Sequence, residues 1–172
     1  EMLGLLVAPV VPLLVGLCIF LHSLVLIASR RKFSVPMNSC YPPILSWNVR
    51  GLNSAAKHTT INEVATTHKS SLLCLQETKI DVWSSELVRD IGRAQLDGCV
   101  VLPTIGSRGG IAMFWDKGLL DVQFHRIGLF SISAKVTVLQ SQSSFWITTV
   151  YGPADDGRKD QFLQEMATAA PG

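Results

Sequence analysis

Three short segments of this chain each place a polar side chain at the end of an apolar run. Asn48 lies in the segment LSWNVRGLN, Glu77 follows the run LLCLQ, and Tyr151 closes the run WITTVY. Strand ends are rigid and exposed, so they often carry the side chains of an active site. Mg²⁺ prefers oxygen ligands, typically one or two carboxylates with waters and phosphate oxygens. Glu77 is therefore the best candidate for a metal ligand.

Asn48 and Tyr151 have chemical roles available beside such a cation. The Asn48 amide could orient a phosphate group or hold a metal-bound water. The Tyr151 hydroxyl could hydrogen-bond a phosphate or help to activate a nucleophilic water. Each residue also has an ordinary structural role, because Asn often ends a strand in a turn, tyrosines often keep the hydroxyl in solvent, and Glu77 could pair with Lys79. Taken singly, these residues leave both interpretations open.

Two arginines lie where a phosphodiester would need positive charge. Arg50 follows Asn48 closely, and Arg108 belongs to the segment Ser107–Gly110, whose paired glycines permit close approach to the backbone. Solvated side chains and a simple hairpin turn explain the same residues equally well. Arg50 and Arg108 are therefore candidate phosphate-binding residues.

The elements that would position these residues follow an α/β order. Apolar runs predict strands at 44–49 and 71–76, and a helical pattern at 54–68 between them completes a βαβ-like unit. A weaker helix is predicted at 83–95. A final amphipathic helix is predicted near the end of the sequence, with an apolar side formed by Phe162, Leu163, Met166 and Ala167. Five further strands are predicted at 99–102, 110–115, 120–126, 130–139 and 144–151.

The N-terminal segment differs from the rest of the chain. Residues 2–29 contain no Asp, Glu, Lys or Arg, and the basic triplet 30–32 follows them. A helix of this length would extend roughly 40 Å at about 1.5 Å per residue, enough to cross a bilayer core of about 30 Å. The expected organisation is an apolar helix with a basic flank (1–32), a linker (33–43) and an α/β domain (44–172). The apolar run admits two interpretations, a membrane-spanning helix or a stretch without a selected role.

The net charge of the domain and the spacing of its cysteines argue against two classes of function, tight DNA binding and zinc binding. Of the 15 basic and 13 acidic residues, three basic ones and Glu1 lie in the N-terminal segment, so residues 33–172 hold 12 of each sign. A neutral domain without a basic stripe does not support tight, sequence-independent DNA binding. The four cysteines lack the spacing of a zinc site, and Cys74 and Cys99 lie in apolar runs typical of buried, reduced thiols. No protein partner is predicted.

Taken in order, the segments LSWNVRGLN, LCLQETK, RGGIAMFW and WITTVYGP resemble the endonuclease/exonuclease/phosphatase superfamily. They look most like the endonuclease domain of plant LINE-type (non-LTR) retrotransposons, and the resemblance covers residues 44–171. It implies a four-layer α/β sandwich, of which this chain would form part, and Mg²⁺-dependent hydrolysis of a phosphodiester. The resemblance points to DNA as a partner, while the sequence leaves the substrate open between DNA, RNA and a small phosphoester.

The same resemblance implies roles for the candidate residues. Glu77 would be the direct metal ligand, Asn48 would lie at the metal and the phosphate, and Tyr151 would match the active-site tyrosine of the family. Arg50 stands where the apurinic repair nucleases of the superfamily carry an Asp. This difference favours the retroelement branch over repair.

A larger departure concerns the rest of the family's site. That site is completed by a Gly-Asp-Phe-Asn-like motif and by later Asp and Ser-Asp-His motifs, which supply the transition-state Asn/Asp and the general-base His–Asp pair. None of these occurs in this sequence. General acid–base assistance is typically worth about 10²–10⁴-fold in rate. We therefore expect a C-terminally truncated domain with little or no activity alone.

Three hypotheses follow from the sequence. The first is a truncated member of this superfamily, descended from a Mg²⁺-dependent nuclease and with little or no activity alone. The second is a membrane-anchored, non-catalytic domain whose functional part is the segment 2–29. The third and least favoured is an intact small phosphodiesterase that takes its base from another residue, such as His125. Localisation stays open between a membrane, if residues 2–29 span a bilayer, and the nucleus, where a retroelement endonuclease would act.

Overall fold

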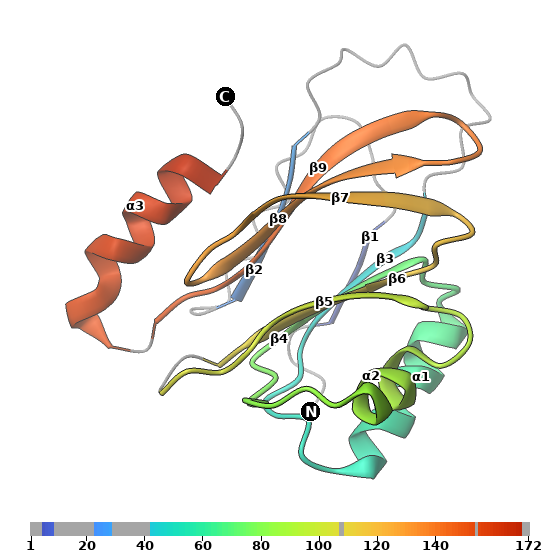
Figure 1. The fold of residues 1–172 in the computed structure, drawn as a ribbon, viewed down its shortest axis with the longest axis horizontal. Coiled ribbons are helices and arrows are strands. Elements are labelled where there is room, and N and C mark those ends of the chain that lie inside the picture. The colour runs from blue at the N-terminus through green and yellow to red at the C-terminus, as the bar shows by residue number, and fades with distance from the viewer. Residues whose placement is uncertain (1–4, 9–22, 29–41, 107–108, 154, 170–172) are drawn as a thin grey trace.

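Helices and strands follow one another along the chain as in an α/β protein (Figure 1). The computed structural model describes residues 5–8, 23–28, 42–106, 109–153 and 155–169. The predicted α/β class is confirmed. All five strands predicted between residues 99 and 151 are present, and their bounds agree with the prediction to within one residue.

Five strands form the first sheet, in the order β1-β3-β4-β6-β5. β3 and β4 are parallel and are connected by α1 (Ala55–Thr67), so the predicted βαβ unit is confirmed. β6 runs antiparallel to β4. The ends of β3 and β4 and the start of β6 therefore lie at one end of the sheet. The strand bounds are Leu5–Ala8 for β1, Ile44–Asn48 for β3, Leu72–Gln76 for β4, Gly98–Leu102 for β5 and Ile111–Trp115 for β6.

Four strands form the second sheet, in the order β2-β9-β8-β7, and all neighbours are antiparallel. Their bounds are Ser23–Ala28 for β2, Leu120–Ile127 for β7, Ser131–Val138 for β8 and Ser143–Tyr151 for β9. The register between β7 and β8 shifts between Phe124 and Arg126. Irregularities of this kind are common at sheet edges, where they hinder pairing with other chains.

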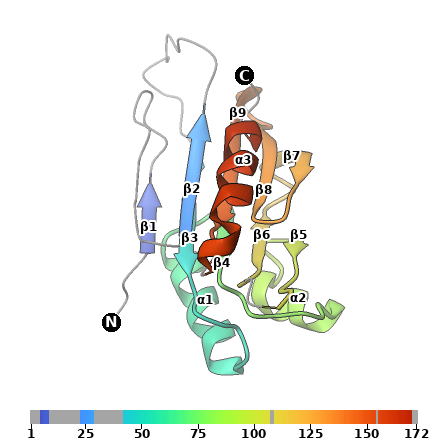
Figure 2. The same cartoon turned by 90° about the vertical axis from the view of Figure 1, so that its left-hand side faces the viewer.

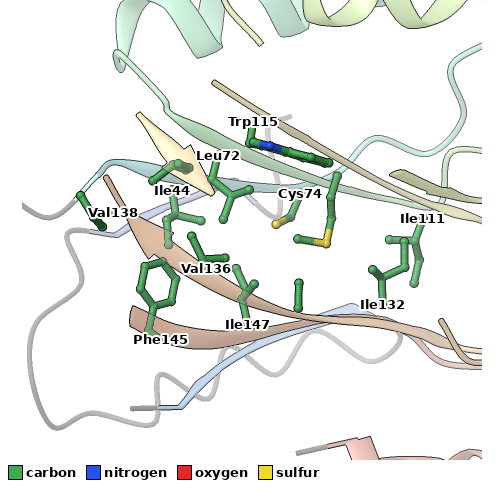
Figure 3. Close-up of a cluster of buried hydrophobic side chains, with 13 residues drawn as sticks. Ile44, Leu72, Cys74, Ile111, Trp115, Ile132, Val136, Val138, Phe145 and Ile147 are labelled. Carbon is green, nitrogen blue, oxygen red and sulfur yellow. The ribbon is translucent and has the colours of Figure 1, made fainter. Parts of the chain in front are cut away.

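The two sheets face each other across a core of apolar side chains, which Figure 3 shows in close-up. Leu72 and Cys74 enter it from the first sheet, and Ile132, Val136 and Ile147 enter it from the second; all five are 0 % exposed. The alternating pattern of β8 explains its share, because every second side chain of a strand points to the same face. This core fixes the two sheets relative to each other.

Two cysteines in the described residues are free thiols. Burial raises the pKa of Cys74 to about 12, and it raises the pKa of Cys99 to about 12 as well. The thiolate is the reactive form of cysteine. Both residues therefore stay protonated near neutral pH. The predicted burial is confirmed for Cys74, whereas Cys99 is only partly buried.

Helices cover the outer faces of both sheets (Figure 1). α1 and α2 (Ser85–Gly92) pack on the first sheet through a second apolar core, to which Ile61 and Ile91 contribute from the helices and Phe114 from β6. On the other side, a short 3₁₀ helix (Asp156–Arg158) leads into α3 (Lys159–Ala169). α3 lies against the second sheet, where Ser133 Oγ donates to Ala169 O at 3.1 Å. The layers are thus helices, sheet, sheet and helix.

The apolar helix predicted over residues 2–29 is not confirmed. The structure describes two parts of this segment, and both are strands: β1 pairs with β3 and β2 pairs with β9, on the side of the molecule opposite β5 and β7 (Figure 2). A run of Leu, Val and Ile suits a strand as well as a helix, and periodicity does not separate the two. Within the ranges that the structure describes, no helix is long and apolar enough to cross a membrane. The basic triplet and nearly all of the predicted linker lie outside the described residues.

Candidate active site

Three of the predicted site residues stand at the ends of strands. Asn48 is the last residue of β3, where it pairs in register with Gln76, the last residue of β4. Glu77 follows Gln76 directly, and the carboxyl ends of these parallel strands lie side by side. Tyr151 is the last residue of β9 in the other sheet. The candidate site is therefore assembled from both sheets.

Backbone hydrogen bonds join the loops at this end of the first sheet. Gly51 N–H donates to Glu77 O at 2.6 Å, and Leu52 N–H donates to Thr78 O at 2.9 Å. The segment before β6 is hydrogen-bonded to the loop after β4, because Lys79 N–H donates to Gly109 O at 2.7 Å. The loops after β3 and β4 and the loop before β6 thus form one continuous edge.

The backbone of this edge is in the left-handed region at several positions. Arg50, Glu77 and Lys79 have φ of 50°, 56° and 55°, and the glycines Gly51 and Gly110 have φ of 98° and 76°. Non-glycine residues adopt positive φ at a cost of about 1 kcal/mol or more, and such residues cluster at active sites and ligand clamps. Three of the six non-glycine residues with positive φ in the described part of the chain thus lie at this edge, Glu77 among them.

Glu77 forms an ion pair with Lys79, whose Nζ lies 2.9 Å from Glu77 Oε1. The side chain of Glu77 is 17 % exposed and that of Lys79 is 52 % exposed. A partly buried carboxylate is costly without a partner, so the ammonium group stabilises it. Glu77 therefore has the structural role that the sequence allowed for it, the ion pair with Lys79. A bound cation would have to replace this ammonium at the carboxylate.

The charge of Glu77 affects the pKa of Tyr151, although the two residues belong to different sheets. Burial raises the pKa of the Tyr151 hydroxyl above its usual range, and the negative charge of Glu77 raises this pKa further. The hydroxyl therefore remains neutral to a higher pH than that of an exposed tyrosine, whose pKa is about 10. A neutral phenol keeps its proton and can donate a hydrogen bond.

We expect Glu77→Gln to lower the pKa of Tyr151 without restoring the usual value, because burial is the larger cause. The folded-state pKa is the raised one. Tyr151 thus stabilises the fold at pH values below its unfolded-state pKa, and this contribution is lost as the pH rises through the folded-state pKa. Ultraviolet titration of tyrosinate measures this pKa, with Tyr151→Phe to subtract the signal of Tyr41. An unchanged pKa in Glu77→Gln would show that the two groups do not interact.

Gly109 brings the Arg-Gly-Gly segment against Tyr151. A Cβ atom at Gly109 would lie 2.5 Å from Cε1 and 2.7 Å from Cζ of the tyrosine ring. Any larger residue would therefore displace the ring. A shallow pocket adjoins the same ring, lined by Leu102, Pro103, Gly110, Ile111, Leu129 and Phe130 together with Tyr151.

No protein-family model and no curated protein matches this chain.

Of the two arginines predicted to bind phosphate, the structure describes only one. Arg50 is exposed at the site edge, and its backbone N–H donates to Asn48 Oδ1 at 3.2 Å. Arg108 lies outside the described residues. His125, the alternative base, is on β7 in the second sheet, and its side chain is outside the described part as well.

The side chains at this edge supply some of the ligands that Mg²⁺ prefers. Glu77 offers a carboxylate and Asn48 an amide oxygen, and Mg²⁺ commonly takes one or two carboxylates with waters and substrate phosphate. Among the described residues, no group of three or more His, Cys, Asp or Glu side chains could hold a metal ion. The donor set thus fits a weak, open magnesium site and does not fit a closed structural one.

Sequence reasoning missed Lys57 and His58, which hold the loop between β3 and α1. Lys57 Nζ donates to three backbone carbonyls of that loop, and His58 Nε2 lies 2.7 Å from Leu52 O. Both residues belong to the first turns of α1. Lysine in the first turns of a helix is usually a solvated residue, so no sequence signal identifies this contact.

Proposed function

We propose that residues 44–153 form the metal- and phosphate-binding edge of a phosphodiester hydrolase of the endonuclease/exonuclease/phosphatase type, with DNA as the substrate class. The observation that carries this proposal is the position of Gly109 between the two sheets. Its carbonyl accepts from the N–H of Lys79, the ion-pair partner of Glu77, and a Cβ atom on it would lie 2.5 Å from the ring of Tyr151. The charge of Glu77 raises the pKa of Tyr151 across this contact. The strained backbone at Glu77 and the order of the layers support it. We propose likewise that the two sheets and their helices form part of the four-layer sandwich of that superfamily.

Each residue has a distinct role in this proposal. Glu77 and Asn48 would hold Mg²⁺, which offsets the charge of a phosphate and polarises it when bound. Tyr151, kept neutral by its surroundings, donates a hydrogen bond to a phosphate oxygen. Arg50 and Lys79 supply positive charge beside the same phosphate.

The 172 residues contain neither the Gly-Asp-Phe-Asn-like motif nor the Ser-Asp-His motif of the superfamily. Without a general base the rate falls by about 10²–10⁴-fold. The chain is therefore proposed to bind Mg²⁺ and phosphodiesters with little turnover.

Metal titration of the full chain tests this proposal. We expect Mn²⁺, used as a paramagnetic substitute for Mg²⁺, to broaden the NMR signals of the Asn48 side chain and of the Glu77 backbone. Glu77→Gln is expected to weaken the binding by about tenfold or more, because it removes the carboxylate charge. Glu86→Gln makes the same chemical change at an exposed position in the first turn of α2 and is expected to bind as the unmodified chain does.

Incubation with supercoiled plasmid and Mg²⁺ tests the limit on turnover. Nicking by the full chain is expected not to exceed that of Glu77→Gln. Strong nicking that depends on Glu77 would overturn this part of the proposal. Equal metal binding by Glu77→Gln and the unmodified chain would overturn the site itself.

A further inference from the structure

The loop from Val49 to Leu52 has a hydrogen-bond partner for every backbone polar group. The N–H groups of Val49, Gly51 and Leu52 donate to the carbonyls of Gln76, Glu77 and Thr78, and the N–H of Arg50 donates to Asn48 Oδ1. The four carbonyls of the loop are bound by side chains of α1. Complete pairing of this kind is unusual for a loop, where water normally supplies part of it.

Lys57 supplies most of the carbonyl partners. Its Nζ donates to Val49 O at 2.9 Å, to Arg50 O at 3.1 Å and to Gly51 O at 2.9 Å. A lysine ammonium has three N–H donors, so these three bonds use all of them. The bonds to Val49 and Gly51 are partly buried, although the residue as a whole is exposed.

The loop that Lys57 holds is connected to both halves of the candidate metal site. Asn48 precedes the loop and accepts from Arg50 N–H within it. Gly51 N–H reaches the carbonyl of Glu77, which itself has a positive φ of 56°. A change in the loop would therefore move the Asn48 side chain and the backbone of Glu77 together.

We propose that Lys57 is a positioning residue that sets the distance between Asn48 and Glu77 by gathering the three loop carbonyls. Because the loop carbonyls use all three donors of its ammonium group, Lys57 would act on a metal or phosphate only through the loop. Its effect on the metal rests on the proposed function, whereas its effect on the loop does not. His58, at the next position, holds the fourth carbonyl, that of Leu52, in the same way.

The test compares Lys57→Met, Lys57→Arg and Lys69→Met in the full chain. Lys69 is an exposed lysine just after α1, so Lys69→Met controls for the loss of one positive charge. We expect Lys57→Met to accelerate amide hydrogen exchange at Gly51 and Leu52 by about fivefold or more, because it removes three charge-assisted hydrogen bonds, two of them partly buried. Mn²⁺ binding, followed at Asn48, is expected to weaken by a similar factor. Lys57→Arg is expected to recover part of both effects, and Lys69→Met to show neither.

The two measurements separate this inference from the proposed function. Unchanged exchange at Gly51 and Leu52 in Lys57→Met would refute the role of Lys57. Faster exchange with unchanged Mn²⁺ affinity would also refute it, because the loop would then be ordered without positioning the site. A chain that fails to bind Mn²⁺ before any substitution would refute the proposed function, and the exchange rates would then decide the role of Lys57 in the loop.

Discussion

Phe114→Ala is expected to lower the free energy of unfolding by about 3–5 kcal/mol, the largest effect of any substitution considered for this chain. Phe114 is on β6 and is 0 % exposed, in the core between the first sheet and its helices. Its ring centroid lies 6.3 Å from that of Trp83, at an interplanar angle of 53°. Alanine would leave a cavity because strands β4 and β5, which flank β6, cannot close over it.

Urea denaturation followed by fluorescence measures this loss. Val82→Ala, at an exposed apolar position, is the control and is expected to change the stability by less than about 0.5 kcal/mol. A loss below about 1 kcal/mol for Phe114→Ala would show that the core between sheet and helices is not packed as described.

Glu165→Leu is expected to cost about 3 kcal/mol, because it leaves buried donors without an acceptor. Glu165 is on α3 and is buried, and its carboxylate accepts from Leu129 N–H at 2.9 Å, Phe130 N–H at 3.0 Å and Ser131 Oγ–H at 2.6 Å. Gly128 makes room for this carboxylate, since a Cβ atom there would overlap it. The three bonds hold α3 to the turn between β7 and β8.

Amide hydrogen exchange at Leu129 and Phe130 reports this contact directly, and denaturation gives its energy. Gln164→Leu places the same side chain at the neighbouring exposed position and is expected to be nearly neutral. If Glu165→Leu left the exchange at Leu129 and Phe130 unchanged, the carboxylate would not be what anchors the helix.

The sheets could be predicted from the sequence because their patterns are local. β4 is a continuous apolar run and is buried along its whole length, and β8 alternates apolar and polar residues as a strand with two different faces does. Asn48, Glu77 and Tyr151 could be located for the same reason, since each stands where such a pattern ends. The approach of Tyr151, in the second sheet, to Gly109 at the edge of the first sheet is a tertiary property that no local pattern contains.

The final helix shows where pattern reasoning fails. Its apolar side was predicted to hold Phe162, Leu163, Met166 and Ala167, yet Leu163 is 62 % exposed and Ala167 is exposed as well. The buried residues of this helix are Ala169 and Glu165, and Glu165 is charged. Counting apolar side chains cannot reveal that backbone N–H groups far along the chain need a carboxylate acceptor. The helix prediction for the N-terminal segment fails for another reason, because a run of apolar residues fits a strand as well as a helix.

The pairing of β2 with β9 has a consequence for synthesis of the chain. β7, β8 and β9 follow one another and pair as hairpins, so they can form as soon as they leave the ribosome. β2 must wait, because it pairs with β9, whose residues are synthesised long after Ser23–Ala28. During that interval the apolar residues 23–28 have no strand of their own sheet to join. Apolar surface and unpaired strand edges exposed in this way favour aggregation, which chaperones counteract during synthesis.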